Sequence, residues 1–557
     1  MKNLNYKFWF VALLVGTFVL NFIQALFTGV MSDETYYMLY GAHLSWGYFD
    51  HPPAVAFLIK ISSLLFSGVL GIRFMTTVLY SFTLFFIWKV IDEKYADKEK
   101  VLLFFLIAYS VVMFSVFGFI TTPDVPLLFF TALFLYAYKQ FLKDPSLKIV
   151  LLLGIVMAGL VYSKYQASLV IGFVVISNLR LLRNGRFWAA ALLGLFLLFP
   201  HFYWQYIHDF PTFKYHLIER ASEFKWWYIL EYGINIFLVF NPFVFCAIVY
   251  IIIKYRPRDL FERALYFLII GFISFFWVMG IRGHIQPQWT VAASIPMIII
   301  LYSRMQENKK LKNYAIKFML PTLFILLIVR VLIASNSFVA AKIGFEKTHP
   351  QSQLISKVAG DLPVVFVGSF QGPSKYHYFT SKKAFSLSSI EGRYTQFDIW
   401  QFEKQYHNKP VFVCAEVPGR SKKISEGGIT IDGFVTSSLQ TVNRMHVDFE
   451  IPVLQMRQGD TIIMQLSVHN PYPFTIDFHH PQFPVKVSAV FFNKDKHTFQ
   501  PVGFDSPIEQ ISAGDTIKRE VRFTVPKLTK GKYQFGISLS TCICNSLNSK
   551  LVKIELK

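Results

Sequence analysis

The stretch SDETYYMLYGAHLSWGYFDHPP, residues 32–53, directly follows an apolar run at residues 8–30. It holds two adjacent carboxylates, Asp33 and Glu34, a third at Asp50, two histidines and several Tyr and Trp residues. A charged side chain beside a membrane-spanning helix is costly unless it has a function. The stretch therefore predicts chemistry at the boundary between water and lipid.

Composition assigns the chain to the polytopic membrane proteins. Of its 557 residues, 54% are hydrophobic and only 16% are charged, and the mean hydropathy is +0.42. A soluble domain does not need so much apolar surface. The net charge of +21 would indicate nucleic acid in a soluble protein. Here Lys and Arg in loops that face anionic lipid explain it better.

Eleven apolar segments are candidates for spanning helices, which need about 20 residues each. The run at 8–30 is long enough to span, and no small-residue cleavage site follows it, so we interpret it as a retained helix rather than a signal peptide. Residues 54–69 follow Pro52-Pro53 and are short, which predicts an interfacial helix, and a second amphipathic helix is expected from Glu34 to Leu44. The expected spans are 8–30, 71–90, 101–118, 125–142, 147–162, 167–182, 187–203, 229–252, 264–281, 289–303 and 317–335.

Lys and Arg alternate between the loops in a way that predicts orientation. With the N-terminus in the cytoplasm, the loops rich in Lys and Arg all fall inside, which is the positive-inside pattern. These loops are 92–100, 139–148, 180–186, 254–263 and 303–312. The outer loops are poorer in Lys and Arg and richer in His, Trp, Tyr, Pro and acids: 32–53, 120–124, 163–166, 204–228 and 282–289. The chain is thus expected to be a multi-pass protein of the cell inner (cytoplasmic) membrane, with its unusual loops on the outer, periplasmic face.

After about residue 336 the apolar runs shorten and alternate with polar residues. Segments 363–370 and 409–417 have the pattern of buried strands, and from about 425 onward the period-2 pattern of half-buried strands predominates. We expect a polytopic α-helical membrane domain over 1–335, a mixed α/β extracytoplasmic segment over 336–424, and an extracytoplasmic β-sandwich-like domain over 425–557.

Three outer acids are candidates for catalysis. Asp33 and Glu34 follow Ser32, so they also fit an ordinary helix start, where acids are common in the first turn. Asp124, in the motif Thr-Pro-Asp, fits a helix start equally well. At the membrane edge an unpaired carboxylate is costlier, so a functional role for Asp124 is about as well supported as capping.

Basic groups at the outer ends of distant spans indicate an anionic partner. Lys164 with Tyr165, Arg73, and Arg282 with His284 all interrupt the positive-inside trend. A lysine at an interface ordinarily extends its charge to water, which is the simpler explanation of each one alone. Their joint placement suits a phosphate or pyrophosphate head group.

The corner Asp50-His51-Pro52-Pro53 and the aromatic loop at 203–228 are less specific. Near acids, His51 could bind phosphate or a metal, and Asp50 with His284 is a possible metal pair, although no metal is required. The four cysteines are too few for a disulfide framework, and their spacing fits no metal site. The aromatic loop could be an interfacial belt or the wall of a sugar or lipid groove.

Together these motifs resemble the integral-membrane glycosyltransferases of the GT-C type. The branch that includes the aminoarabinose transferase of lipid A and the protein O-mannosyltransferases is the most similar. The resemblance covers residues 8–335, with a weaker element at 392–400. It rests on the acidic pair in SDETYY, the corner from Trp46 to Pro53, Thr122-Pro123-Asp124, Lys164-Tyr165, and the loop from His284 to Trp289.

The resemblance implies roles for these residues and no required cofactor. Asp33 would be the catalytic base, Glu34 would support it, and Asp124 would be the second acid of the site. Aminoarabinose transferases have Lys where this chain has His51, so the role of His51 is less firmly implied than that of Lys164. The donor phosphate would contact Lys164, Arg73, His51, Tyr165 and Arg282, whereas acceptor or sugar would contact Asp50, His284, Gln288, Trp46 and Tyr36.

The expected reaction is inverting transfer of a sugar from a polyprenyl-phosphate donor to a hydroxyl or phosphate of lipid A, another glycolipid, a glycan or a protein. A lipid-linked donor explains a site at the membrane surface. Such a displacement needs a carboxylate near the nucleophile and positive charge on the leaving phosphate. Alternatives are an oligosaccharide ligase or polymerase with a pyrophosphate-linked donor, a lipid or sugar transporter, and a sensor. A transporter is expected to place its polar residues in mid-membrane, and a sensor leaves the outer acids unexplained.

Overall fold

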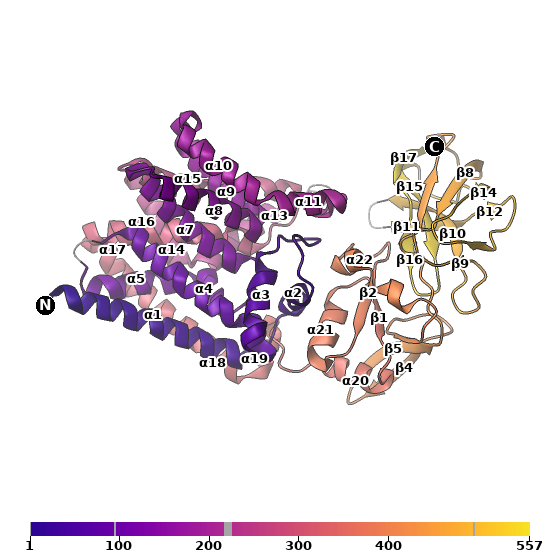
Figure 1. The fold of residues 1–557 in the computed structure, drawn as a ribbon, viewed down its shortest axis with the longest axis horizontal. Helices are drawn as coiled ribbons and strands as arrows, with labels where there is room; N and C mark the ends of the chain where they lie inside the picture. Colours follow the sequence, from indigo (N-terminus) through magenta and orange to yellow (C-terminus); the bar gives the residue numbers. More distant parts are fainter. Residues whose placement is uncertain (1, 94–95, 217–224, 494–495) are drawn as a thin grey trace. The chain divides into compact units, whose positions relative to one another are not determined.

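The computed structural model describes residues 2–93, 96–216, 225–493 and 496–557, so small parts of the loops at 92–100 and 203–228 lie outside the described residues. The chain divides into two compact units, Met1–Lys347 and Thr348–Lys557. The first is helical, and the second contains all of the named strands (Figure 1).

The helical unit begins with α1 (Lys2–Phe27), which is followed by the two short helices of the first outer loop, α2 (Ser32–Ala42) and α3 (Ala54–Leu65). Both helices expected in this loop are therefore present. The remaining helices are α4 (Gly68–Ile91), α5 (Lys98–Ser110), α6 (Val112–Val116), α7 (Asp124–Lys143), α8 (Leu147–Ser163), η1 (Tyr165–Ala167), α9 (Ser168–Ser177), η2 (Leu179–Arg183), α10 (Gly185–Leu197), α11 (Phe199–Ile207), α12 (Pro211–Lys214), α13 (Trp227–Phe240), α14 (Pro242–Lys254), α15 (Leu260–Met279), η4 (Gly280–Arg282), η5 (Pro287–Ala293), α16 (Ser294–Glu307), α17 (Lys309–Tyr314), η6 (Ala315–Met319), α18 (Leu320–Ser335) and α19 (Ser337–Ile343).

A membrane-type helical fold is observed, but the predicted count of eleven spans is not confirmed. Among the described residues, five helices are long and apolar enough to cross a membrane, or seven if each of two bent pairs forms one span. The expected span 229–252 is one of these pairs, because α13 and α14 meet at 101°. The bend lies at Asn241, whose φ is +73°, and Pro242 follows it at the start of α14. Hydropathy alone does not detect such a break.

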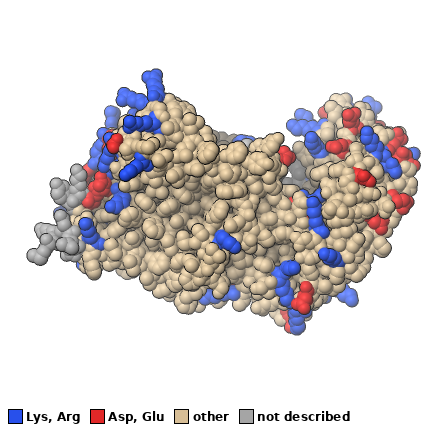
Figure 2. All heavy atoms as spheres, viewed as in Figure 1, with Lys and Arg blue, Asp and Glu red and all other residues tan. Residues whose placement is uncertain are grey.

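The helices pack around one large apolar core in which α4, α7, α15 and α16 contribute many buried side chains. Figure 1 places the start of α1 at one end of this unit and α2 and α3 at the other. On the face drawn in Figure 2, most Lys and Arg of the helical unit gather toward the end where the chain begins. The first outer loop thus lies far from the region where basic side chains are concentrated.

The second unit begins with a mixed sheet of strand order β2-β1-β3-β5-β4. In it, β1 pairs in parallel with β2 and β3, whereas β3, β5 and β4 are antiparallel. Its elements are α20 (Pro350–Ala359), β1 (Val364–Val367), α21 (Gln371–Thr380), β2 (Ala384–Leu387), α22 (Gln396–Trp400), η7 (Phe402–Tyr406), β3 (Val411–Val413), β4 (Lys422–Glu426) and β5 (Ile429–Thr436). The expected boundary between residues 424 and 425 falls inside β4.

Two further sheets share an apolar core. One has the order β11-β10-β15-β17-β7 with β16 on β15, the other has the order β12-β14-β8-β6, and β9 and β13 form a separate pair. The strands predicted from period-2 patterns are β8, β10, β14 and β15, and β8 alternates exposed and buried residues as expected. The bounds are β6 (His446–Phe449), β7 (Gln455–Met456), β8 (Thr461–His469), β9 (Ile476–Asp477), β10 (Lys486–Asn493), β11 (Lys496–Pro501), β12 (Gly503–Phe504), β13 (Gln510–Ile511), β14 (Thr516–Thr524), β15 (Gly531–Ser540), β16 (Asn545–Leu547) and β17 (Val552–Leu556).

Candidate active site

Glu34 is the fixed member of the acidic pair. It lies in the first turn of α2 and is fully buried. Its Oε1 accepts hydrogen bonds from Arg73 Nε at 2.7 Å and from the Thr121 backbone N–H at 3.0 Å. Its Oε2 accepts from Arg73 Nη2 at 2.5 Å and from the Met31 backbone N–H at 3.0 Å. The last bond closes the first turn of the helix, as a glutamate at this position often does.

Arg73, on α4, forms a buried ion pair with Glu34, and we call this pair the Glu34–Arg73 anchor of α2. Two of its N–H groups bind Glu34, as described, and the others donate to backbone carbonyls in the last turn of α1 and just after it. The distances are 3.0 Å to Ala25 O, 2.8 Å to Thr28 O and 2.7 Å to Gly29 O. A guanidinium has five N–H donors, and five bonds are present on a side chain with no exposed area. No donor remains for a phosphate, so we reassign Arg73 from phosphate binding to holding α2.

Asp33 is exposed, in contrast to its neighbour. One turn further along α2 stands Tyr37, and the pKa of its hydroxyl is raised, first by burial and then by three nearby carboxylates. These carboxylates belong to Asp33, Asp50 and Asp124. Three acids from three separate motifs are therefore gathered around one tyrosine.

Asp124 and Lys164 form a buried ion pair. Lys164 Nζ donates to Asp124 Oδ1 at 2.7 Å, and the two side chains are 6% and 5% exposed. Asp124 opens α7, and Lys164 lies between α8 and η1. The helix-start interpretation of Asp124 is thus incomplete, because its carboxylate binds a cation that comes from 40 residues further along the chain.

Tyrosines of α2 hold the Asp-His corner. Tyr40 Oη donates to Asp50 Oδ1 at 2.6 Å, and Tyr37 Oη bonds to His51 Nε2 at 3.0 Å. The ring of Tyr48 stacks on that of Tyr40 with centroids 4.0 Å apart. The corner and the acidic pair therefore belong to one cluster built on α2.

Tyr165 is joined to a histidine that the sequence analysis did not single out. Its hydroxyl lies 2.9 Å from His201 Nε2, and His201 Nδ1 lies 2.6 Å from the carbonyl oxygen of Trp46. A carbonyl only accepts, so Nδ1 carries the proton and Nε2 accepts from Tyr165. Gln205 Nε2 donates to the same tyrosine hydroxyl at 2.8 Å.

The other predicted residues are less closely tied to this cluster. The Trp46 side chain is 49% exposed, and Tyr36 is buried beside Tyr40. Arg282 and His284 are exposed, and His284 Nε2 lies 3.1 Å from a carboxylate oxygen of Glu231. Gln288 Nε2 donates to the side chain of its neighbour Gln286.

The suggested metal pair lacks support from the geometry. Over the described part of the chain, no group of three or more His, Cys, Asp or Glu side chains lies close enough to hold a metal ion. Asp50 is bound by Tyr40, whereas His284 faces Glu231 from α13. We derive no step through a metal.

Sequence reasoning missed Tyr37, Tyr40, His201 and Gln205. The two tyrosines are among several Tyr and Trp residues in the stretch 32–53, and nothing in the sequence distinguishes them from the others. His201 falls within the apolar segment 187–203, and an ionisable residue inside such a segment is a recognised sign of function. That sign was available and could have identified His201.

Part of the helical unit is similar to a known protein family. Residues 50–204 match the family model of dolichyl-phosphate-mannose-protein mannosyltransferase. This range includes Asp50, Asp124, Lys164 and Tyr165 but not Asp33. No curated protein sequence matches the chain.

Among solved structures, the chain is similar to ArnT from Cupriavidus metallidurans. The apo crystal structure has 13% sequence identity and a TM-score of 0.52, covering 76% of this chain and 97% of that one. The crystal structure bound to undecaprenyl phosphate has 12% identity and a TM-score of 0.51 over the same shares. The fold is that of the GT-C glycosyltransferases. The predicted resemblance is confirmed, and with it the class of enzyme, a glycosyltransferase.

Proposed function

We propose that this chain transfers a sugar from a polyprenyl-phosphate donor to an acceptor hydroxyl or phosphate, with inversion at the anomeric carbon. The observation that carries the proposal is the buried Lys164–Asp124 pair within a cluster of acids at the end of the helical unit where α2 lies. A buried cation beside several acids is what a reaction needs when a phosphate leaves and a nucleophile loses a proton.

Asp33 is the proposed base. It is exposed, so an acceptor could reach it, whereas Glu34 is fully buried and its two oxygens already accept four hydrogen bonds. A general base must come within hydrogen-bond distance of the proton that it takes. Only Asp33 of the two can do so without dismantling the anchor, and Glu34 is assigned to positioning α2.

Lys164 is the proposed ligand of the donor phosphate. An ammonium group has three N–H donors, and Asp124 occupies one of them. The carboxylate of Asp124 holds the lysine in place. As the sugar departs, negative charge develops on the phosphate, and the ammonium group of Lys164, already held in position, stabilises it. The undecaprenyl phosphate bound by the similar ArnT structure supports a lipid-linked donor.

The reaction balances without a cofactor. The acceptor oxygen forms a bond to the anomeric carbon as the bond from that carbon to the phosphate oxygen breaks. Asp33 receives the acceptor proton, and the polyprenyl phosphate leaves with the bonding electron pair. His51 and Arg282 are proposed as weaker phosphate contacts, and Tyr165 as a positioning residue. Asp50, Trp46, Tyr36, His284 and Gln288 are proposed on the sugar or acceptor side.

The positive-inside pattern supports an outer-face site in the cytoplasmic membrane. We propose that the N-terminus is cytoplasmic and that the first outer loop and residues 336–557 are extracytoplasmic. The partners would be membrane lipids, the lipid-linked donor, and a glycolipid, glycan or protein acceptor.

The test uses the purified full chain with a panel of polyprenyl-phosphate sugars. Release of polyprenyl phosphate is followed by mass spectrometry in the presence of an extract of envelope lipids and secreted proteins. We expect release with one donor, its loss in Asp33→Asn, and a product mass that identifies the acceptor. Full activity of Asp33→Asn would overturn the base assignment, and release only from pyrophosphate-linked donors would overturn the donor class.

A further inference from the structure

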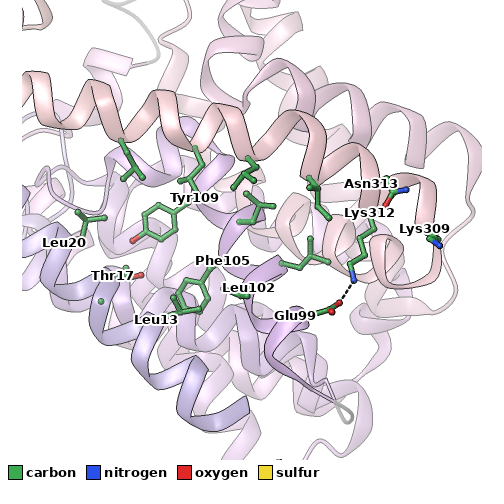
Figure 3. A pocket seen from close by; sticks show the side chains of 17 residues that line it. Leu13, Thr17, Leu20, Glu99, Leu102, Phe105, Tyr109, Lys309, Lys312 and Asn313 are labelled. Atoms are coloured by element: carbon green, nitrogen blue, oxygen red, sulfur yellow. Dashed lines mark hydrogen bonds and ion pairs between the residues drawn. The ribbon is translucent and has the colours of Figure 1, made fainter. Parts of the chain in front are cut away.

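A large apolar groove lies in the helical unit between α1, α5 and the α17–α18 segment, and none of the proposed catalytic residues lines it. Its volume is about 950 Å³. Figure 3 shows Leu13, Leu102 and Phe105 on its apolar wall, and Lys309, Lys312 and Asn313 at one end. The groove thus joins a hydrocarbon-like wall to a polar end.

One flank of the groove faces the surroundings. Among the five candidate spans of the described chain, Lys309–Ser335 is the least buried, at 17% against 61% for Asp124–Lys143. Its turn Ala315–Met319 is of the π type, which often occurs at functional sites. On α1, Gly16 lines the groove, and a Cβ placed there would meet no atom within 4 Å. The groove is therefore open to lipid and has room for more atoms.

The depth of the groove matches one leaflet. On α5 the lining runs from Glu99 to Tyr109, which is about 15 Å at a rise of about 1.5 Å per residue. The hydrocarbon core of a bilayer is about 30 Å thick, so one leaflet has about half of that. The polar end then lies at the depth of the lipid head groups.

The polar end carries net positive charge. Lys312 Nζ binds Glu99 Oε2 at 3.0 Å, as the dashed line in Figure 3 marks. Lys309 is exposed at the same end. One lysine is therefore balanced by a carboxylate, and the second adds a charge that an anionic head group would complement.

We propose that this groove binds an anionic glycerophospholipid, with its acyl chains between α1, α5 and α18 and its phosphate at Lys309 and Lys312. The assignment to the cytoplasmic leaflet rests on the orientation proposed above, but lipid binding itself does not. The lipid would be a bound structural component rather than the sugar donor, because the acids around Tyr37 belong to the opposite end of the helical unit (Figure 1).

Native mass spectrometry of the purified full chain in neutral detergent tests the proposal. Phosphatidylglycerol and phosphatidylcholine with identical acyl chains are titrated separately, and the fraction of protein carrying each lipid is measured. We expect stronger retention of phosphatidylglycerol, and a loss of about fivefold in Lys309→Gln, the effect of about one surface lysine near anionic lipid.

Two glycine variants test the location. Gly16→Phe should fill the groove and reduce retention of both lipids. Gly172→Phe is the matched control, because a Cβ at this α9 position also meets no atom within 4 Å but the residue is outside the groove. We expect the control to retain lipid as the unmodified chain does.

Equal retention of the two lipids would overturn the selection for an anionic head group. Unchanged retention in Gly16→Phe, or an equal loss in Gly172→Phe, would overturn the location. If Gly16→Phe does not fold, the Lys309→Gln titration still decides the head-group assignment. None of these readouts involves sugar transfer, so failure here is distinguishable from failure of the proposed reaction.

Discussion

Replacing Glu34 by Gln should weaken the Glu34–Arg73 anchor while leaving Asp33, the proposed base, unchanged. Each carboxylate oxygen of Glu34 accepts two N–H groups, one of which always comes from Arg73. Whichever oxygen becomes an amide nitrogen, two donors lose their acceptor and face another donor. Removing one partner of a buried ion pair typically costs about 3–5 kcal/mol.

The expected effect on melting follows from the size of the helical unit. An unfolding entropy of about 2 cal/mol/K per residue over residues 1–347 converts this cost into a fall of about 4–7 °C. The matched control is Asp33→Asn, the same chemical change one residue earlier on an exposed side chain. Exposed substitutions usually stay within about 0.5 kcal/mol, here less than about 1 °C.

Thermal unfolding in detergent and polyprenyl-phosphate release are measured on the same preparations. Glu34→Gln should melt early, whereas Asp33→Asn should melt normally and lose activity. A double variant, Glu34→Leu with Arg73→Met, should not recover stability, because three backbone carbonyls at and just after the end of α1 still lose their donors. A melting temperature of Glu34→Gln within 1 °C of that of the unmodified chain would refute the claim that the Glu34–Arg73 anchor stabilises the helical unit.

Three further changes should have distinct signatures. Lys164→Met should lower sugar transfer by about 100-fold or more, as loss of a donor to a developing anion does, and unchanged turnover at saturating donor would contradict its role. Tyr165→Phe leaves His201 Nε2 without its donor and should lower activity by about tenfold, measured as kcat and KM separately, with normal activity as the contrary result. In the second unit, burial lowers the pKa of His407 to about 4 from 6.5. The unfolded state then binds more protons between these values, so stability should fall as pH drops from 6.5 toward 4. His407→Phe, which keeps the stack on Phe474, should flatten this dependence in thermal unfolding.

The order of the site motifs was readable from the sequence, but their contacts were not. Lys164 and Asp124 were both proposed, yet nothing in their spacing of 40 residues indicates that they touch. Arg73 was assigned to phosphate from its charge and expected position. Its true environment depends on three backbone carbonyls, and carbonyls carry no sequence signature.

The span count is not confirmed, for a related reason. Hydropathy records how apolar a segment is, but not where its backbone turns. Residues 229–252 are apolar throughout, yet Asn241 adopts a positive φ and the helix axis changes direction by 101°. By contrast, the strands of the second unit were predictable because alternation of side chains between two faces is a local property.

The adjacent acids of α2 lie in different surroundings, one exposed and one buried, because a helix turns about 100° per residue. Side chains that are neighbours in sequence cannot face the same partner, so the contact of Glu34 with Arg73 turns Asp33 toward another side. Residues four and seven positions later share the side of Asp33, and these are Tyr37 and Tyr40, which hold His51 and Asp50. Asp33, Tyr37 and Tyr40 therefore form the face of α2 that contacts the Asp50-His51 corner. The burial of Glu34 fixes the direction in which this face points. It follows that Glu34 should not take over from Asp33: Asp33→Ala, which keeps the carboxylate of Glu34 in place, should lose transfer. Activity in that variant would show that the face of α2 does not decide which acid acts.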